Sequence, residues 1–188
     1  MKKKIVGFGE ILLRLSPPGY LKLIQTDMLT ANYTGAEANT LVSLQNFGYD
    51  TCFVTKVPDN DVAACAIATM RKYGVDVSKT VYGGERLGTY YSEKGASQRP
   101  SKVLYARKYS SISTAAPEDF CWDEILDGAD AFHFTGITAA LGGALPEICL
   151  EACKTAKRKG ATVFCDLNYR KKLWPENEAQ RVMKTLMP

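Results

Sequence analysis

The amino-acid sequence predicts an α/β fold: a mainly parallel sheet flanked by helices, with a small projecting β-sheet. Three segments each contain a helical pattern, a glycine and then an apolar β-rich run, which is the order of helix–strand units in a parallel sheet. In the middle of the chain, short β-rich runs separated by turn residues depart from that order. With 46% hydrophobic and 23% charged residues, the 188-residue chain has the ordinary composition of a soluble globular protein.

The first residues, Met1–Glu10, begin with lysines and a short apolar stretch, as a signal peptide does. That stretch is too short for a signal peptide, and it is soon interrupted by the charged residues Glu10 and Arg14. We therefore interpret it as the first strand of a cytoplasmic protein. Ile11–Ser16 is predicted to be a second strand, ended by Pro17-Pro18-Gly19. No segment reaches the roughly 18 uninterrupted apolar residues of a membrane span.

The repeated unit is a helix followed by glycine and strand. Glycine suits the left-handed position that follows a helix. In the second unit, Val62, Ala66, Ile67 and Met70 recur at helical spacing, so this helix is expected to face a core. The predicted units are Gly35–Phe47, Gly48 and Thr51–Val57; Asp59–Tyr73, Gly74 and Val75–Tyr82; and Leu145–Lys159, Gly160 and Ala161–Leu167.

The middle segment predicts a hairpin, Leu87–Glu93 and Ser101–Arg107, joined by a turn-rich loop. With Ile11–Ser16, this hairpin would form the projecting sheet, with strands drawn from about 11–24 and 86–110. Such a sheet could serve as a lid or as an oligomer contact. The remaining predicted elements are a short helix over Asp119–Asp127, a core strand over Ala129–Thr135 and an amphipathic helix over Glu176–Met187. No strand pattern comes after that helix, so we expect residues 1–188 to be the N-terminal part of a longer domain.

Charge and cysteine usage exclude several classes of function. A net charge of +4 is not concentrated enough to predict nucleic-acid binding. The densest basic run, Lys154 to Lys159, lies late in a predicted helix and is interpreted as a solvated face. The six cysteines form no CxxC motif, and His133 is the single histidine, so a zinc site is not expected. We interpret the cysteines as buried free thiols.

Polar residues come after the apolar run Val163–Cys165 at alternate positions: Asp166, Asn168 and Arg170. Alternation along an extended segment would place all three on one side, at the carboxyl end of a strand, where ligands of α/β sheets bind. Arginine offers a planar fork to a carboxylate or phosphate, asparagine donates and accepts, and aspartate can hold a cation or a hydroxyl. The pattern predicts a ligand-facing strand end.

A second group, Thr34–Asn39, opens a helix with very small residues. The free amides of a helix N-terminus can receive an anion or sugar oxygens. Gly35 would allow close approach, and Asn39 lies one turn further on the same side. A tightly packed helix start, with Asn39 as a satisfied polar residue, is the alternative, and these residues alone leave both open.

Further motifs carry weaker signals. Gly7-Phe8-Gly9 suggests a dinucleotide fingerprint, but the third glycine is missing and the next element is a strand, not a helix. Tyr105 and Arg107 share one side of a predicted strand, and Tyr90 lies on its hairpin partner. These side chains could cover a polar ligand and bind its carboxylate, or they could form a solvated face. His133, between two phenylalanines, fits a satisfied core or near-site residue better than a catalytic base.

Together these residues resemble the ribokinase-like (PfkB) carbohydrate kinases, and within them the 2-keto-3-deoxygluconate kinases. The order and spacing of the motifs carry the resemblance over essentially the whole chain. They are Gly7–Glu10, Thr34–Asn39, Phe53–Asp59, Tyr105 with Arg107, His133–Thr138, and Asp166–Arg170 followed by Leu173-Trp174.

The resemblance implies that ATP, assisted by Mg²⁺, phosphorylates a hydroxyl of a sugar acid such as 2-keto-3-deoxygluconate. It also implies a homo-oligomer formed through the lid sheet. On the sugar side, Gly35 and Asn39 would hold hydroxyls, Tyr90 and Tyr105 would cover the sugar from the lid, and Glu10 would lie at the floor of the site. On the anionic side, Arg107 and Arg170 would meet the carboxylate, with Arg170 also near the phosphates. Asn168 would lie towards the nucleotide, and Asp166 would support the polar cluster or the metal's water shell.

Two departures from the family pattern stand out. Thr34 occupies a position where the family usually has a second glycine. The family's Gly-Ala-Gly-Asp signature, which would supply the catalytic base and the anion hole, does not occur in these 188 residues. We therefore expect no catalytic residue in this chain and no activity from it alone. The alternatives are a fructokinase-like or other PfkB sugar kinase and a non-catalytic sugar-binding module.

Overall fold

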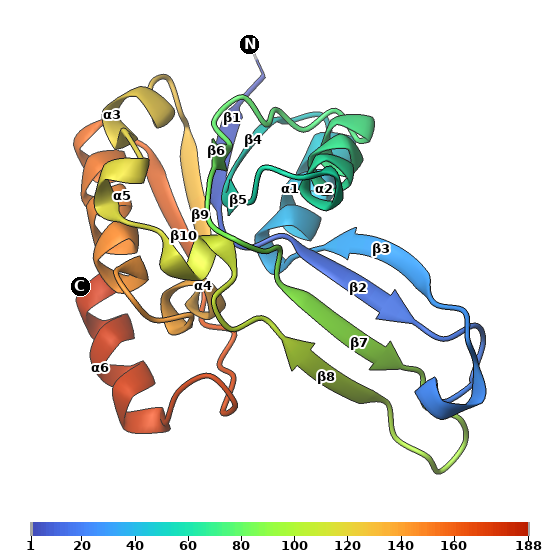
Figure 1. The fold of residues 1–188 in the computed structure, drawn as a ribbon. Coiled ribbons are helices and arrows are strands. Elements are labelled where there is room, and N and C mark those ends of the chain that lie inside the picture. The colour runs from blue at the N-terminus through green and yellow to red at the C-terminus, as the bar shows by residue number, and fades with distance from the viewer. Residues whose placement is uncertain (1, 188) are drawn as a thin grey trace.

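The computed structural model describes residues 2–187 and contains the predicted parallel sheet (Figure 1). Its strands are β1 (Lys4–Phe8), β4 (Asp50–Val54), β9 (Ala131–Thr135) and β10 (Thr162–Asp166), in the order β10-β9-β1-β4. Every pair is parallel, so all four carboxyl ends meet at one edge. The projecting sheet leaves the main body from this edge (Figure 1), which confirms the predicted fold class.

Helices cover both faces of the main sheet (Figure 1). On one face lie α5 (Leu145–Arg158) and α6 (Glu176–Leu186), with the short α3 (Trp122–Ile125) and α4 (Gly136–Ala140). On the other face lie α1 (Ala36–Asn46) and α2 (Asp61–Lys72). A hydrophobic core lies on each face of the sheet, and the side chains of β1 alternate between the two. Val6 and Phe8 pack on the α5 side, and Ile5 packs on the α1 side.

The projecting sheet has four strands, in the order β3 (Thr30–Thr34), β2 (Leu12–Ser16), β7 (Thr89–Glu93) and β8 (Lys102–Ala106). The hairpin of β7 and β8 is antiparallel, and β2 joins it in parallel. Strand β3 lies outside the segments from which we expected lid strands. It lacks a clear apolar alternation. It pairs with β2, from which it is separated in the sequence by the single-turn helix η1 (Leu23–Gln25).

Two further differences from the predicted elements have local causes. The predicted strand Val75–Tyr82 is reduced to β6 (Val81–Tyr82), which pairs with β5 (Lys56–Val57); before it, only Asp76 bridges to the main sheet. Helix α4 was not predicted, because five residues are too few to display a helical period. Single-turn helices η2 (Ser111–Thr114) and η3 (Pro117–Asp119) complete the connection from the projecting sheet. Gly48, Gly74 and Gly160 have positive φ, as predicted.

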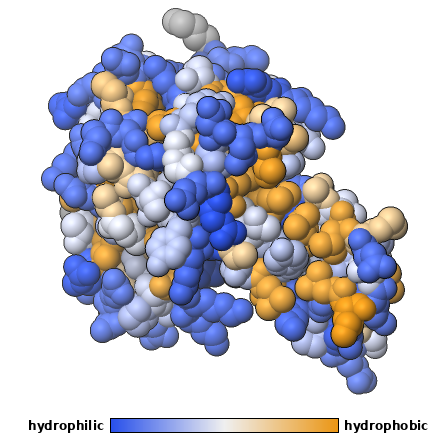
Figure 2. Space-filling view, viewed as in Figure 1, coloured by the Kyte–Doolittle hydropathy of each residue, from blue (hydrophilic) through white to orange (hydrophobic). Residues whose placement is uncertain are grey.

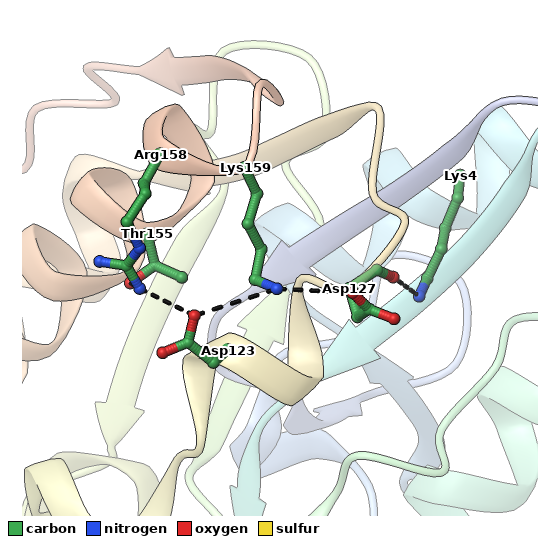
Figure 3. A network of polar contacts seen from close by, with 6 residues as sticks. All are labelled: Lys4, Asp123, Asp127, Thr155, Arg158 and Lys159. Carbon is green, nitrogen blue, oxygen red and sulfur yellow. Dashed lines mark hydrogen bonds and ion pairs between the residues drawn. The ribbon is translucent and has the colours of Figure 1, made fainter.

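The basic run at the end of α5 forms a surface network with acidic residues around α3 (Figure 3). Arg158 donates to Asp123 at 2.8 Å, and Lys159 lies 3.4 Å from Asp127. Lys4 donates to the backbone carbonyl of Asp127 at 2.7 Å. The basic run is therefore a solvated helix face, as expected from the sequence. Its pairs link α5 to the acidic residues around α3, and Lys4 links β1 to the same region.

The cysteine prediction is only partly correct. All six thiols are free, and Cys52, Cys149 and Cys153 are buried, but Cys65 and Cys121 are exposed and Cys165 is half-buried. Within residues 2–187, none of the helices combines the length and the apolarity that crossing a membrane requires.

Candidate functional site

A cleft of about 730 Å³ lies where the projecting sheet meets the main body. One side is formed by β8 and the residues that follow it, and the other by the segment after β10. None of the described residues that line it is acidic. Its cationic side chains are Arg107, Lys108, Arg170, Lys171 and Lys172. A concave surface with charges of a single sign concentrates anions, so this cleft is suited to an anionic ligand.

The segment after β10 differs from the predicted arrangement. The strand ends at Asp166, and Asn168 has a φ of 40°, so the extended alternation stops there. The carboxylate of Asp166 accepts the backbone N–H of Asn168 at 3.0 Å, which is an Asx turn. The prediction that Asp166, Asn168 and Arg170 share one side of a strand is therefore wrong. Arg170 lines the cleft, whereas Asp166 lines a separate cavity of about 530 Å³ together with His133.

The turn is held close to the main body. Gly136 packs so tightly against the carbonyl oxygen of Leu167 that a Cβ at position 136 would overlap it. The guanidinium of Arg170 donates to the carbonyl of Tyr169 at 3.0 Å, and its side chain is otherwise exposed. Arg170 is thus positioned by its own turn and keeps donors free for a ligand.

On the projecting sheet, the structure brings together the three side chains singled out there. Tyr90 faces Tyr105 across the β7–β8 ladder, with ring centroids 5.6 Å apart. The guanidinium carbon of Arg107 lies 5.4 Å from the centre of the Tyr105 ring, a cation–π geometry. Burial raises the pKa of the Tyr90 phenol. Tyr105 and Arg107 line the cleft, and Tyr90 is adjacent to them through the Tyr105 ring.

Glu10 lies beneath this group and is 3% exposed. Its carboxylate forms an ion pair with Arg107 and accepts the hydroxyl of Ser110 at 2.8 Å. Burial raises the pKa of Glu10 above its ordinary value of 4.5, while Arg107 and Ser110 oppose that rise. The Nε of Arg107 is buried without a hydrogen-bond partner.

The start of α1 has the tight packing that one of the two interpretations expected, while ligand binding there stays a prediction. Gly35 is buried, and a Cβ there would overlap the backbone carbonyl of Glu10, so glycine is required for packing. Asn39 is exposed, and its side-chain oxygen accepts the hydroxyl of Thr34 at 3.0 Å. Asn39 therefore keeps an amide group available at the surface of the helix start.

Sequence reasoning missed Glu37, which lies within the same motif. It is 1% exposed, and its carboxylate accepts the backbone N–H of Thr135 at 2.9 Å and the hydroxyl of Thr138 at 2.6 Å. Glu37 thus joins the start of α1 to the end of β9. An acidic residue among the small residues of a first helical turn was the available signal, since the helix dipole favours a carboxylate there.

Comparisons with known proteins indicate the family and the fold of the chain. The sequence profile of the pfkB family carbohydrate kinases matches residues 2–188. A 2-dehydro-3-deoxygalactonokinase of Haloferax volcanii is 35% identical over 188 residues, all of this chain and 59% of that protein. A 2-dehydro-3-deoxygluconokinase of Bacillus subtilis is 27% identical over 177 residues, or 94% of this chain and 54% of that protein.

Solved structures give the same result. The crystal structure of 2-dehydro-3-deoxygluconokinase from Thermotoga maritima superimposes with a TM-score of 0.97 at 52% identity, covering 98% of this chain and 57% of that one. A sugar kinase of Pyrococcus horikoshii, solved in complex with ATP, shares the fold with a TM-score of 0.81 at 23% identity. The chain thus spans somewhat more than half the length of these relatives, and it belongs to the pfkB family of carbohydrate kinases.

Proposed function

We propose that this chain forms the sugar-acid-binding part of an ATP-dependent kinase that acts on 2-keto-3-deoxygluconate or a closely related sugar acid. The observation that carries the proposal is the cleft with five cationic side chains and no acidic one among its described lining residues. A sugar acid and ATP both bring negative charge to the site, whereas a neutral hexose brings no charge for these cations to bind. The names of the Haloferax and Thermotoga relatives support the same substrate class.

Arg107 and Arg170 enter the cleft from its two sides, one after β8 and the other after β10. We assign to them the sugar carboxylate, because a guanidinium binds a carboxylate through two parallel hydrogen bonds. Tyr90 and Tyr105 would cover the sugar ring from the projecting sheet. Gly35 and Asn39 would meet sugar hydroxyls at the start of α1, the former through its backbone.

ATP, when bound, supplies the phosphoryl group, and the chain contributes side chains that hold and orient the reactants. Arg170 and Asn168 are assigned to the nucleotide side, because both lie in the exposed turn after β10. Asp166 is an exposed carboxylate beside that turn, suited to the water shell of a Mg²⁺ ion. Residues 2–187 contain no group of three or more histidine, cysteine or acidic side chains that could hold a metal. The ion would accordingly be held chiefly by phosphate oxygens and water.

The test separates binding from catalysis. Calorimetry should detect binding of 2-keto-3-deoxygluconate to the 188-residue chain, and this ligand should outcompete fructose. Arg107→Ala should abolish that preference, because it removes one of the two carboxylate donors. An equal affinity for the acid and the neutral sugar in the wild-type chain would refute the substrate assignment and favour a fructokinase-like function.

Phosphoryl transfer is tested with a coupled ADP-release assay. Since no group in the cleft is assigned as a catalytic base, we expect no transfer by residues 1–188 alone. A longer polypeptide that continues through a Gly-Ala-Gly-Asp sequence should be active. Turnover by the 188-residue chain would contradict this part of the proposal and would require a base among its own residues.

Association through the projecting sheet forms part of the same proposal. Figure 2 shows apolar side chains gathered on the lobe that this sheet forms. Ile24 is 92% exposed and Met28 is 70% exposed, which is unusual for large apolar side chains. We propose a homo-oligomer that buries them, in the cytoplasm, where ATP is available and free thiols persist. Sedimentation of Ile24→Lys against wild type tests the contact: an unchanged sedimentation coefficient would place the interface elsewhere.

A further inference from the structure

All four connections between the main body and the projecting sheet converge on Glu10. Residue 10 itself leads from β1 into β2, and its backbone carbonyl is packed against Gly35, which follows β3. Its carboxylate lies against Gly88, which precedes β7, and a Cβ at position 88 would overlap it. After β8, the chain returns through Arg107 and Ser110, and both donate to the same carboxylate. A single buried residue therefore contacts every crossing between the two parts, through its backbone at Gly35 and through its carboxylate at Gly88, Arg107 and Ser110.

The contacts of Glu10 leave it little scope for a direct role in ligand binding. It is 3% exposed, and its two carboxylate oxygens are each engaged by a different donor, Arg107 and Ser110. Arg107, in contrast, lines the cleft although its side chain is only 10% exposed. One face of its guanidinium is near the Tyr105 ring, and one terminal nitrogen is paired with Glu10. The direction of the remaining donors is set by these two contacts.

We propose that Glu10 is a positioning residue. It fixes the guanidinium of Arg107 in the cleft and holds the four connections of the projecting sheet together, without touching the sugar acid. This replaces the expected role of Glu10 at the floor of the sugar site with an indirect one. The inference relies on the proposed function only in that Arg107 is taken to bind the ligand's carboxylate.

A structural ion pair would also bury Glu10, so the test must separate positioning from stability. Glu10→Gln keeps the size and shape of the side chain and an accepting oxygen, but it removes the charge that orients Arg107. Glu37→Gln is the matched control, because it makes the same change at a carboxylate that is 1% exposed and that bonds to Thr135 and Thr138 without a cation. A general loss of buried charge would affect both variants equally.

The first readout needs no ligand. In the 188-residue chain with ¹⁵N-labelled arginine, the Nε–H signal of Arg107 is identified by its loss in Arg107→Lys. This N–H is buried without a hydrogen-bond partner, so it is shielded only while the bond between Nη2 and Glu10 holds the guanidinium in place. Its hydrogen exchange should therefore be about tenfold or more faster in Glu10→Gln than in wild type. Glu37→Gln should leave the exchange rate unchanged. An Arg107 signal that does not respond to Glu10→Gln overturns the proposal.

The second readout is the ratio of the dissociation constants for fructose and 2-keto-3-deoxygluconate. Glu10→Gln should reduce that ratio by about tenfold, mostly through weaker binding of the acid, while Glu37→Gln should preserve it. Faster Arg107 exchange with an unchanged ratio would also overturn the positioning role. If the wild-type chain shows no preference for the acid, the proposed substrate is refuted, and the exchange experiment alone decides whether Glu10 positions Arg107.

Should Glu10→Gln fail to fold, Ser110→Ala provides the second variant. It removes the hydroxyl that donates to Glu10 at 2.8 Å and leaves the ion pair with Arg107 in place. The Arg107 exchange rate should then rise by a smaller factor than the one expected for Glu10→Gln. An exchange rate equal to that of wild type in folded Ser110→Ala counts against Glu10 as the group that sets the orientation of Arg107.

Discussion

Removal of Arg107 should destabilise the fold in a way that depends on pH. Glu10 is 3% exposed, and Arg107 is the cation that compensates its charge. In Arg107→Ala, an ionised Glu10 would be buried without a counter-ion, which is costly enough that the carboxyl takes up a proton instead. The destabilisation therefore becomes the cost of protonating Glu10 at the working pH.

The size of the effect has an upper limit. The ordinary pKa of 4.5 lies 2.5 units below pH 7, which corresponds to at most about 3.4 kcal/mol. At pH 5 the same limit is about 0.7 kcal/mol. Because wild-type Glu10 already has a raised pKa, part of this cost is present before the substitution. We expect Arg107→Ala to lower the free energy of unfolding by about 2 kcal/mol at pH 7, with a much smaller loss at pH 5.

Urea denaturation of the 188-residue chain at pH 5 and pH 7 measures both values. The control is the same substitution in a Glu10→Gln background, in which there is no carboxyl to protonate. There, Arg107→Ala should have a similar small effect at both pH values, from lost packing of the arginine stem. A loss that is equal at pH 5 and pH 7, or one that persists at full size in the Glu10→Gln background, would refute the reasoning.

Three further results are expected. Burial raises the pKa of Glu10, although Arg107 opposes the rise, and Glu37 is the other nearby charge. The contribution of Glu10 to stability is therefore full below pH 4.5 and is lost as the pH rises through the raised pKa. In urea titrations, the unfolding free energy of wild type minus that of Glu10→Gln should fall between about pH 4 and pH 7, and a rise would contradict the shift. Arg170→Ala should change the unfolding free energy by no more than about 0.5 kcal/mol, because the side chain is exposed. It should nevertheless weaken sugar-acid binding in calorimetry by about tenfold or more, and an affinity equal to that of wild type would remove Arg170 from the site. Raising the ionic strength from 0.1 to 1 M shortens the screening length from about 10 to about 3 Å, so the affinity for the acid should fall while that for fructose stays constant; parallel changes would show that the cleft's cations do not select the ligand.

Much of the secondary structure can be derived from local pattern. The apolar spacing from Val62 to Met70 identified α2, although Val62 itself is exposed and only the later positions face the core. The glycines after α1, α2 and α5 adopt the positive φ that their position predicts. Both signals depend on backbone geometry within one or two turns, so they can be read without knowledge of the fold. Strand β3 gave no such signal, because its residues are held mainly by pairing with β2.

The segment after β10 shows where local pattern misleads. Alternation correctly describes Thr162–Asp166, but beyond it the side chain of Asp166 caps the amide of Asn168 and ends the strand. Aspartate and asparagine can compete with extended backbone in this way, and the sequence contains no signal that decides the competition. The packing of Gly136 against Leu167 is a tertiary contact that holds the turn in place.

The sequence by itself determined the class of fold, the family, and the residue types from which a sugar-acid site can be built: tyrosines and an arginine on the projecting sheet, and a second arginine after β10. Only the tertiary structure decided how they are used. Glu10 meets Arg107 across 97 residues of sequence and Ser110 across 100, and Glu37 meets Thr138 across 101. Contacts over such separations arise from tertiary packing: the Glu10 contacts form where the projecting sheet meets the main body, and the Glu37 contact forms where α1 meets α4. The burial that turns a carboxylate from a ligand contact into a support for Arg107 is therefore a property of the folded chain.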